Sequence, residues 1–172
     1  TEEYNISPGT MAIKFPVTII IKEAAKRRIP ILGICNGFQI LTQLNLLPGK
    51  LILNNTEQFI CKQVECVTVG GGVRGKLTKM YIANSYGNYI PHHYTVQHNF
   101  LMYSDNLPEY NTRIAGIHNE DKTIFGMMPH PERNNNDFKD ILYKIIFPKS
   151  HIIHTQLHFQ KKIDELMNSE HI

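Results

Sequence analysis

The chain has 172 residues, of which 42% are hydrophobic and 19% are charged, and its formal net charge is +3. This size and composition suit a single globular domain over residues 1–172 with its own hydrophobic core. The small, evenly spread charge disfavours a nucleic-acid-binding surface, and no apolar run is long enough to cross a membrane. Three cysteines without a leading apolar signal favour the reducing cytoplasm, and Cys61 and Cys66 are expected to be packing residues.

The first predicted element is a helix over about residues 16–28, because Pro16 suits the first turn of a helix. No strand is predicted before it, whereas an α/β domain normally opens with strands that form the middle of its sheet. The amino-terminal part of the domain is therefore expected to be missing. Either further residues precede Thr1 in the complete protein, or the protein has lost part of its machinery.

An apolar run that ends at Ile34 is followed by Cys35 and at once by an amphipathic segment to about Leu46. This pattern predicts a buried strand, a sharp turn and a helix. The spacing Gly33-x-Cys35-x-Gly37 is typical of a nucleophile on a tight strand-to-helix turn, where residues without Cβ relieve crowding.

Cys35 would stand exposed at the helix N-terminus, where unpaired N–H groups and the helix dipole favour a thiolate. The N–H of Asn36 would point to the place where an oxyanion forms. The same stretch also fits a small buried cysteine that ends a core strand, and by itself it does not decide between the two.

The middle of the chain predicts short strands separated by turns. Gly70-Gly71-Gly72 is interpreted as a flexible turn, because the lysine and the helix of a phosphate-binding loop do not follow it. His151, His154 and His158 lie near metal-ligand spacing, but no carboxylate or cysteine cluster accompanies them, so a polar surface is favoured over a metal site. The predicted strands are 51–53, 58–69, 77–83, 101–104, 113–117 and 123–127, and further helices are predicted at 138–147 and 155–167.

A second candidate site lies around His130. Pro129 fixes its own φ and Pro131 disfavours the helical region for His130, so this segment is predicted to be extended. Residues two apart in an extended chain face the same side, which would let Glu132 hold the imidazole in one tautomer while its other nitrogen faces the cysteine. That is the nucleophile, base and orienter arrangement of acyl transfer. The alternative is a loop histidine beside a solvated carboxylate.

Together, LGICNGFQIL at 32–41 and GMMPHPER at 126–133 resemble one family, and the similarity extends through Asn54 and residues 114–119. Over roughly residues 9–147 the chain is similar to the glutaminase subunits of phosphoribosylformylglycinamidine synthase, which are class I glutamine amidotransferases of purine biosynthesis. The resemblance implies a flavodoxin-like α/β fold, with an open, mostly parallel sheet and helices on both faces, here without its first strands.

The resemblance implies that Cys35 attacks the carboxamide of glutamine, that His130 protonates the leaving ammonia, and that Glu132 orients His130. The residues expected to bind the substrate are Asn36, Gln39 and Gly87. Ammonia would pass to a synthetase subunit, and a further candidate partner is a small accessory subunit. ATP and magnesium are expected on the synthetase, and no cofactor, metal, nucleic acid or membrane is expected to bind this chain.

Two departures from the family keep rival interpretations open. The family has Ala-His-Gly-Glu-Gly where this chain has ANSYG at 83–87, so contacts to glutamine are expected to depend on the backbone and on the retained Gly87. The family's Gly-Gly-Phe-Ser loop, which gives a second oxyanion N–H, would end at or just before Thr1. The rivals are a non-catalytic subunit that only docks on a synthetase, and a class I amidotransferase of another pathway.

Overall fold

The computed structural model describes residues 16–69, 75–92 and 98–133. The predicted helices at 138–147 and 155–167, the predicted turn at 70–72 and the three tail histidines lie outside these ranges. No helix within the described ranges is long and apolar enough to span a membrane. In chain order the described elements are α2 (Val17–Lys26), β1 (Ile31–Ile34), α3 (Asn36–Gln43), β2 (Lys50–Ile52), β3 (Ile60–Thr68), β4 (Leu77–Asn84), β5 (Asn88–Ile90), β6 (Asn99–Tyr103), β7 (Ile114–His118), β8 (Ile124–Met127) and the short 3₁₀ helix η3 (Pro131–Arg133).

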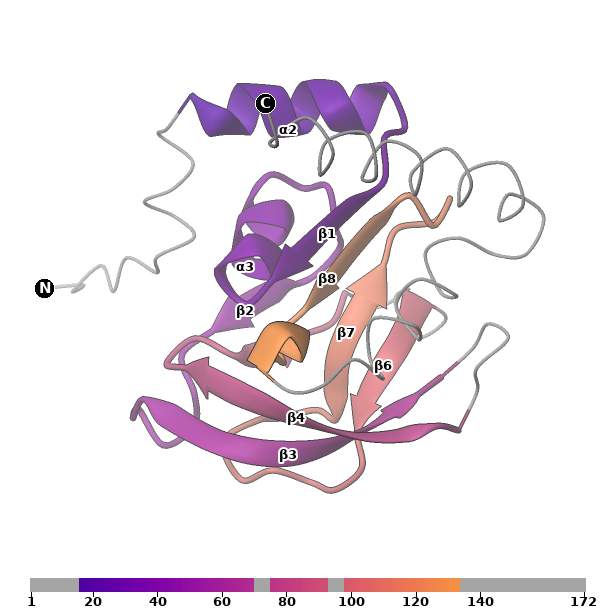
Figure 1. The fold of residues 1–172 in the computed structure, drawn as a ribbon. Coiled ribbons are helices and arrows are strands. Elements are labelled where there is room, and N and C mark those ends of the chain that lie inside the picture. The colour runs from indigo at the N-terminus through magenta and orange to yellow at the C-terminus, as the bar shows by residue number, and fades with distance from the viewer. Residues whose placement is uncertain (1–15, 70–74, 93–97, 134–172) are drawn as a thin grey trace, which may run out of the picture.

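Six strands form a curved sheet in the order β1-β8-β7-β6-β3-β4, and β2 pairs with β5 in a second, small sheet (Figure 1). The expected open α/β sheet is present, but within the described residues its pairing is mixed rather than mostly parallel. Only β1 and β8 run parallel, while the other neighbours in the large sheet are antiparallel. The reason is connectivity, because β3/β4 and β7/β8 join through connections too short for a parallel crossover.

The predicted elements are found with small shifts at their ends. The helix after the cysteine turn ends at Gln43 rather than near Leu46, because Asn45 has a φ of 56°. A residue in this left-handed region typically ends a helix, and here the N–H of Leu46 donates to the carbonyl of Leu41 at 3.0 Å. The strand β5 was not predicted, since its three residues are held mainly by pairing with β2.

The core lies in two clusters, one of which joins α3 to the sheet. Phe38, on α3, is fully buried and stacks on Tyr89 at a ring distance of 5.6 Å. This close approach requires glycine on β8, because a Cβ at Gly126 would lie 2.2 Å from the Phe38 ring. A second cluster packs the strands against one another and includes Met80, Ile82, Leu101, Tyr103 and Phe125.

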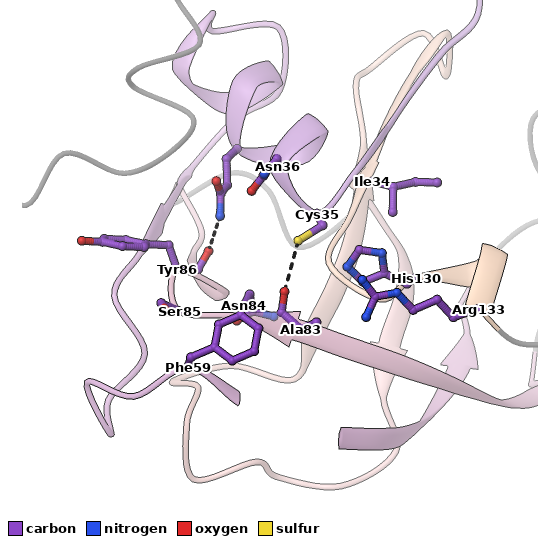
Figure 2. Close-up of a pocket in the computed structure, with 11 residues that line it drawn as sticks. Ile34, Cys35, Asn36, Phe59, Ala83, Asn84, Ser85, Tyr86, His130 and Arg133 are labelled. Atoms are coloured by element: carbon purple, nitrogen blue, oxygen red, sulfur yellow. Dashed lines mark hydrogen bonds between the residues drawn. The ribbon is translucent and has the colours of Figure 1, made fainter. Parts of the chain in front are cut away.

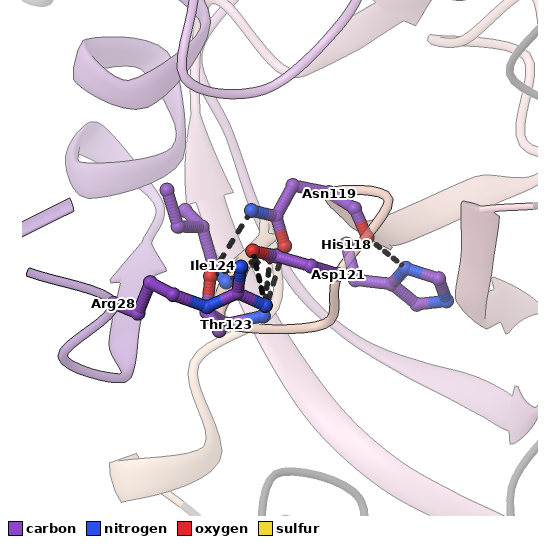
Figure 3. A network of polar contacts seen from close by, with 6 residues as sticks. All are labelled: Arg28, His118, Asn119, Asp121, Thr123 and Ile124. Atoms are coloured by element: carbon purple, nitrogen blue, oxygen red, sulfur yellow. Dashed lines mark hydrogen bonds and ion pairs between the residues drawn. The ribbon is translucent and has the colours of Figure 1, made fainter. Parts of the chain in front are cut away.

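A polar network fixes the starts of the two parallel strands. The Asn119 side-chain oxygen accepts hydrogen bonds from the N–H groups of Thr123 and Ile124, each at 2.9 Å (Figure 3). Asp121 accepts from the Thr123 hydroxyl at 2.6 Å and pairs with Arg28, just before β1, at 3.0 Å. Because β1 and β8 are parallel, this network lies at one end of the pair and the strands finish together at the other.

Candidate active site

The parallel pairing of β1 and β8 brings the two sequence motifs together. Ile34 is in register with Met127, and the N–H of Cys35 donates to the Met127 carbonyl at 2.8 Å. Cys35 follows β1 directly, and His130 follows β8 by three residues. Both candidates therefore lie beyond the carboxyl ends of parallel strands, where α/β sheets bind their ligands.

Cys35 occupies a strained turn between β1 and α3. Its φ of 51° and ψ of −105° are unusual for a residue with a side chain. Position 33 requires glycine, because a Cβ there would lie 2.6 Å from the backbone of Gly37 and would separate α3 from β1. At Gly37 the structure shows no such crowding, since a Cβ there would meet nothing within 4 Å apart from its chain neighbours and the backbone of its own helix turn.

The sulfur of Cys35 is buried rather than exposed, with 8% of the residue accessible to solvent. It donates to the Ala83 carbonyl at 3.6 Å. Burial raises the pKa of the Cys35 thiol above its ordinary value, although the N–H of Asn36 and the guanidinium of Arg133 act to lower it. The helix N-terminus therefore does not lower the pKa of the thiol enough to offset the effect of burial. The thiol needs a base to remove its proton.

His130 and Glu132 are brought together as expected, but not by an extended chain. The N–H of His130 donates to the Tyr81 carbonyl at 2.8 Å, and the chain then turns into η3, which carries Glu132. His130 Nδ1 lies 2.6 Å from Glu132 Oε1. Burial acts to raise the pKa of Glu132, but the hydrogen bond with His130, a backbone hydrogen bond and the nearby charges of His130 and Arg133 together outweigh it, and the pKa is lowered. The carboxylate thus holds the proton on Nδ1, which leaves Nε2 to act as a base.

The base nitrogen itself has no partner among the described residues. The side chain of His130 is 12% exposed. Its Nε2 atom is buried and makes no hydrogen bond with any of the described residues. His130 and Cys35 line one pocket of about 470 Å³, in which Figure 2 shows them next to each other. A buried imidazole nitrogen without a partner beside a buried thiol is suited to taking the thiol proton.

The pocket is built from four parts of the fold that are distant in sequence. The other residues that line it are Ile34, Asn36, Gln39, Phe59, Ala83, Asn84, Ser85, Tyr86 and Arg133. Gln39 donates from Nε2 to the Tyr86 carbonyl at 2.9 Å, while its Oε1 is buried without a partner in the described ranges. Phe59 is 64% exposed at the edge of the pocket. Such a cavity, with several polar side chains around a nucleophile, suits a small polar substrate.

Comparison with known proteins identifies the family. The family model for class I glutamine amidotransferases matches residues 4–147. The chain belongs to the class I glutamine amidotransferase family. Its described fold and the cysteine turn agree with the expected resemblance.

Among its relatives, this amidotransferase is 36% identical over 135 residues to phosphoribosylformylglycinamidine synthase subunit PurQ of Thermotoga maritima, covering 74% of this chain and 62% of that protein. It is 38% identical over 146 residues to the PurQ subunit of Pyrococcus horikoshii, covering 76% of this chain and 66% of the relative. The amidotransferase chain thus spans less than two thirds of the length of these relatives.

Solved structures agree with the family. The amidotransferase superposes on a chain in the structure of PurLQS from Thermotoga maritima with a TM-score of 0.73 and 32% identity, covering 82% of this chain and 72% of the other. A second match is the structure of a Thermoplasma acidophilum protein provisionally assigned to GMP synthase, with a TM-score of 0.52 and 15% identity over 84% and 67% of the two chains. The second match shows a shared fold alone.

The pocket holds most of the predicted site residues. Cys35, Asn36, Gln39 and His130 line it, and Glu132 reaches it through His130. Gly87 does not line the pocket, and its N–H donates to the Asn54 side-chain oxygen at 2.9 Å. That donor is therefore already used by Asn54, and the expectation that Gly87 binds substrate stays a prediction.

Sequence reasoning missed Arg133 and Phe59 as lining residues of the amidotransferase pocket. Arg133 lies three residues after His130, which places it on the same side of a 3₁₀ turn. Predicting that turn instead of an extended chain would have found it. No group of three or more histidine, cysteine, aspartate or glutamate side chains that could hold a metal occurs among residues 16–69, 75–92 and 98–133.

Proposed function

We propose that this chain hydrolyses L-glutamine and delivers the ammonia to a synthetase subunit that makes phosphoribosylformylglycinamidine in de novo purine biosynthesis. One observation carries the glutaminase assignment: a buried cysteine on a strained turn shares a pocket with a histidine whose other nitrogen is held by a carboxylate. The similarity to PurQ subunits supports the pathway.

In the proposed reaction, His130 Nε2 takes the proton from Cys35 Sγ, and the sulfur attacks the carboxamide carbon of glutamine. The N–H of Asn36 stabilises the negative charge that develops on the carbonyl oxygen. His130 then gives its proton to the leaving nitrogen, the carbon–nitrogen bond breaks, and ammonia leaves a thioester on Cys35.

Water completes the cycle. His130 takes a proton from the water while its oxygen attacks the thioester, the carbon–sulfur bond breaks, and the proton returns to the sulfur. Glutamate is released and the thiol is restored. Gln39 and Asn36 are proposed to hold the substrate beside the sulfur, and Glu132 keeps the imidazole in the required tautomer throughout.

We also propose the partners by analogy with the relatives. A synthetase subunit would receive the ammonia, and a small accessory subunit would complete the complex. The name PurLQS, given to the Thermotoga structure that contains a chain similar to this one, supports such an assembly. ATP and magnesium would bind the synthetase, and no cofactor is proposed for this chain. The ANSYG sequence at 83–87 is proposed to form the substrate wall in place of the family's Ala-His-Gly-Glu-Gly.

The test uses the complete protein that contains this chain, assembled with its synthetase. Cys35→Ala should abolish glutamine-dependent synthesis, by at least about a thousandfold, and leave ammonia-dependent synthesis near the wild-type rate, because the cysteine only produces ammonia. Cys61→Ser is the matched control, since Cys61 is exposed and does not line the pocket. Equal loss of both activities in Cys35→Ala would favour a docking role without catalysis and would overturn the proposal.

A further inference from the structure

The turn that follows β4 forms one wall of the pocket, opposite Cys35. Tyr86 O, in this turn, accepts from the Gln39 amide, and Ala83 O, at the end of β4 just before the turn, accepts from the Cys35 thiol. Figure 2 shows both contacts across the pocket. The position of this turn therefore affects a proposed substrate-binding side chain that lies next to the nucleophile.

The turn is held from behind by a buried asparagine. Asn54, in the connection between β2 and β3, is 1% exposed and does not line the pocket. Its backbone N–H donates to the Ser85 carbonyl at 2.8 Å. Its side chain donates from Nδ2 to the Asn84 carbonyl at 2.9 Å and accepts at Oδ1 from the Gly87 N–H at 2.9 Å.

These contacts use both donors and the acceptor of the asparagine amide. The second Nδ2 hydrogen is donated to the Gln58 carbonyl at 3.1 Å. The amide therefore supplies two donors and one acceptor to backbone groups, and no other side chain of this size and shape offers that set without a charge. Aspartate would keep the acceptor but would face the Asn84 and Gln58 carbonyls with an oxygen.

We propose that Asn54 is a positioning residue that sets the turn at 84–87, and through it the fit of glutamine between Gln39 and Cys35. The inference rests on the proposed glutaminase function. A shift of the turn by about one ångström would misalign the carboxamide with the sulfur, and displacements of that size cost up to about a hundredfold in rate. The reacting groups on Cys35 and His130 would stay in place, because the Cys35 N–H bonds to Met127 at the end of β8 and the His130 N–H bonds to Tyr81, which lies within β4 and before the turn.

The experiment compares Asn54→Asp and Asn54→Ala with Asn55→Ala in the complete protein with its synthetase. Asn55 is a matched control, because its amide donates to Pro108 and Asn111 and accepts from the Asn88 side chain on β5, so it bonds to no residue of the turn at 84–87. Two reagents report on Cys35: a chloroketone analogue of glutamine, which must fit the pocket, and iodoacetamide, which need not. Glutamine KM and kcat are measured alongside.

We expect the Asn54 variants to lower kcat/KM for glutamine and the rate of chloroketone labelling by about tenfold to a hundredfold. Iodoacetamide labelling of Cys35 and the partner's ammonia-dependent synthesis should stay within about twofold of wild type. A loss of both labelling rates together would show a folding defect and would overturn the inference, as would wild-type kinetics in both variants. Failure of the chloroketone to label wild-type Cys35 would instead refute the proposed function.

Discussion

At the scale of single residues, the three cysteines differ in environment. Cys61 is exposed, contrary to the expectation that it packs in the core, because it lies on the outer side of β3. Cys66 is fully buried, and burial raises the pKa of its thiol to about 12. Cys35 is buried but faces a pocket of about 470 Å³ that a ligand could enter. Reactivity should therefore depend on the shape of the reagent.

We predict that a chloroketone analogue of glutamine labels Cys35 in preference to Cys61 and Cys66, because only Cys35 lies beside a base in a pocket. Brief iodoacetamide treatment should modify Cys61 first, and Cys66 should react only after unfolding. Mass spectrometry of the labelled peptides checks each site. Chloroketone labelling at Cys61 with Cys35 untouched would contradict the assignment of the nucleophile.

At the scale of elements, the site depends on how closely α3 approaches β1. The glycine at position 33 allows helix and strand to touch, whereas the glycine at position 37 faces open space. The turn at Cys35 is strained, and the close contact at Gly33 helps to keep the cysteine in that conformation. The two glycines of the motif therefore have different physical roles.

Gly33→Ala should lower the free energy of unfolding by about 1–3 kcal/mol, because the new Cβ overlaps the backbone of Gly37 and the end of Leu41. Gly37→Ala is the matched control, and it should be neutral or stabilising by up to about 1 kcal/mol, since alanine favours the helix. Urea denaturation of both variants measures the difference. Equal destabilisation by the two substitutions would refute this account of the helix contact.

At the scale of the whole molecule, one end of the β1/β8 pair carries the candidate site and the other end carries a polar network that stabilises the strands. One end carries Cys35 and leads to His130, and the other carries the polar network around Asn119. The two catalytic candidates come from distant parts of the sequence and meet only when this parallel pair has formed. The network should therefore contribute to stability without taking part in the chemistry.

Asn119→Ala should destabilise the fold by about 1–2 kcal/mol, because the N–H groups of Thr123 and Ile124 lose their acceptor. At a temperature where the variant stays folded, its kcat/KM for glutamine should match wild type within about twofold. Thermal unfolding and steady-state kinetics measure the two effects. A folded variant with impaired kinetics would show that the far end of the strands influences the site.

The sequence by itself predicted the elements around the site and the contact between His130 and Glu132, because these depend on local signals, whereas the catalytic roles of Cys35, His130 and Glu132 stay predictions. An apolar run that stops at a cysteine between glycines predicts a strand, a turn and a helix from neighbouring residues alone. The family resemblance followed from the same short motifs. The predicted extended backbone holds for His130, which forms an isolated antiparallel bridge with Tyr81, but is wrong for Pro131–Arg133, since proline also fits the first turn of a 3₁₀ helix.

Only the tertiary structure decided the burial of Cys35, the exposure of Cys61 and the hydrogen bond from the Gly87 N–H to Asn54. Each depends on atoms far away in sequence: Ala83 over the sulfur, the sheet edge at β3 and the Asn54 amide behind the turn. The mixed pairing of the sheet was decided in the same way, because hydrogen bonds between strands depend on which connections are short. Local pattern sets the identity of an element, whereas solvation and pairing depend on what packs against it.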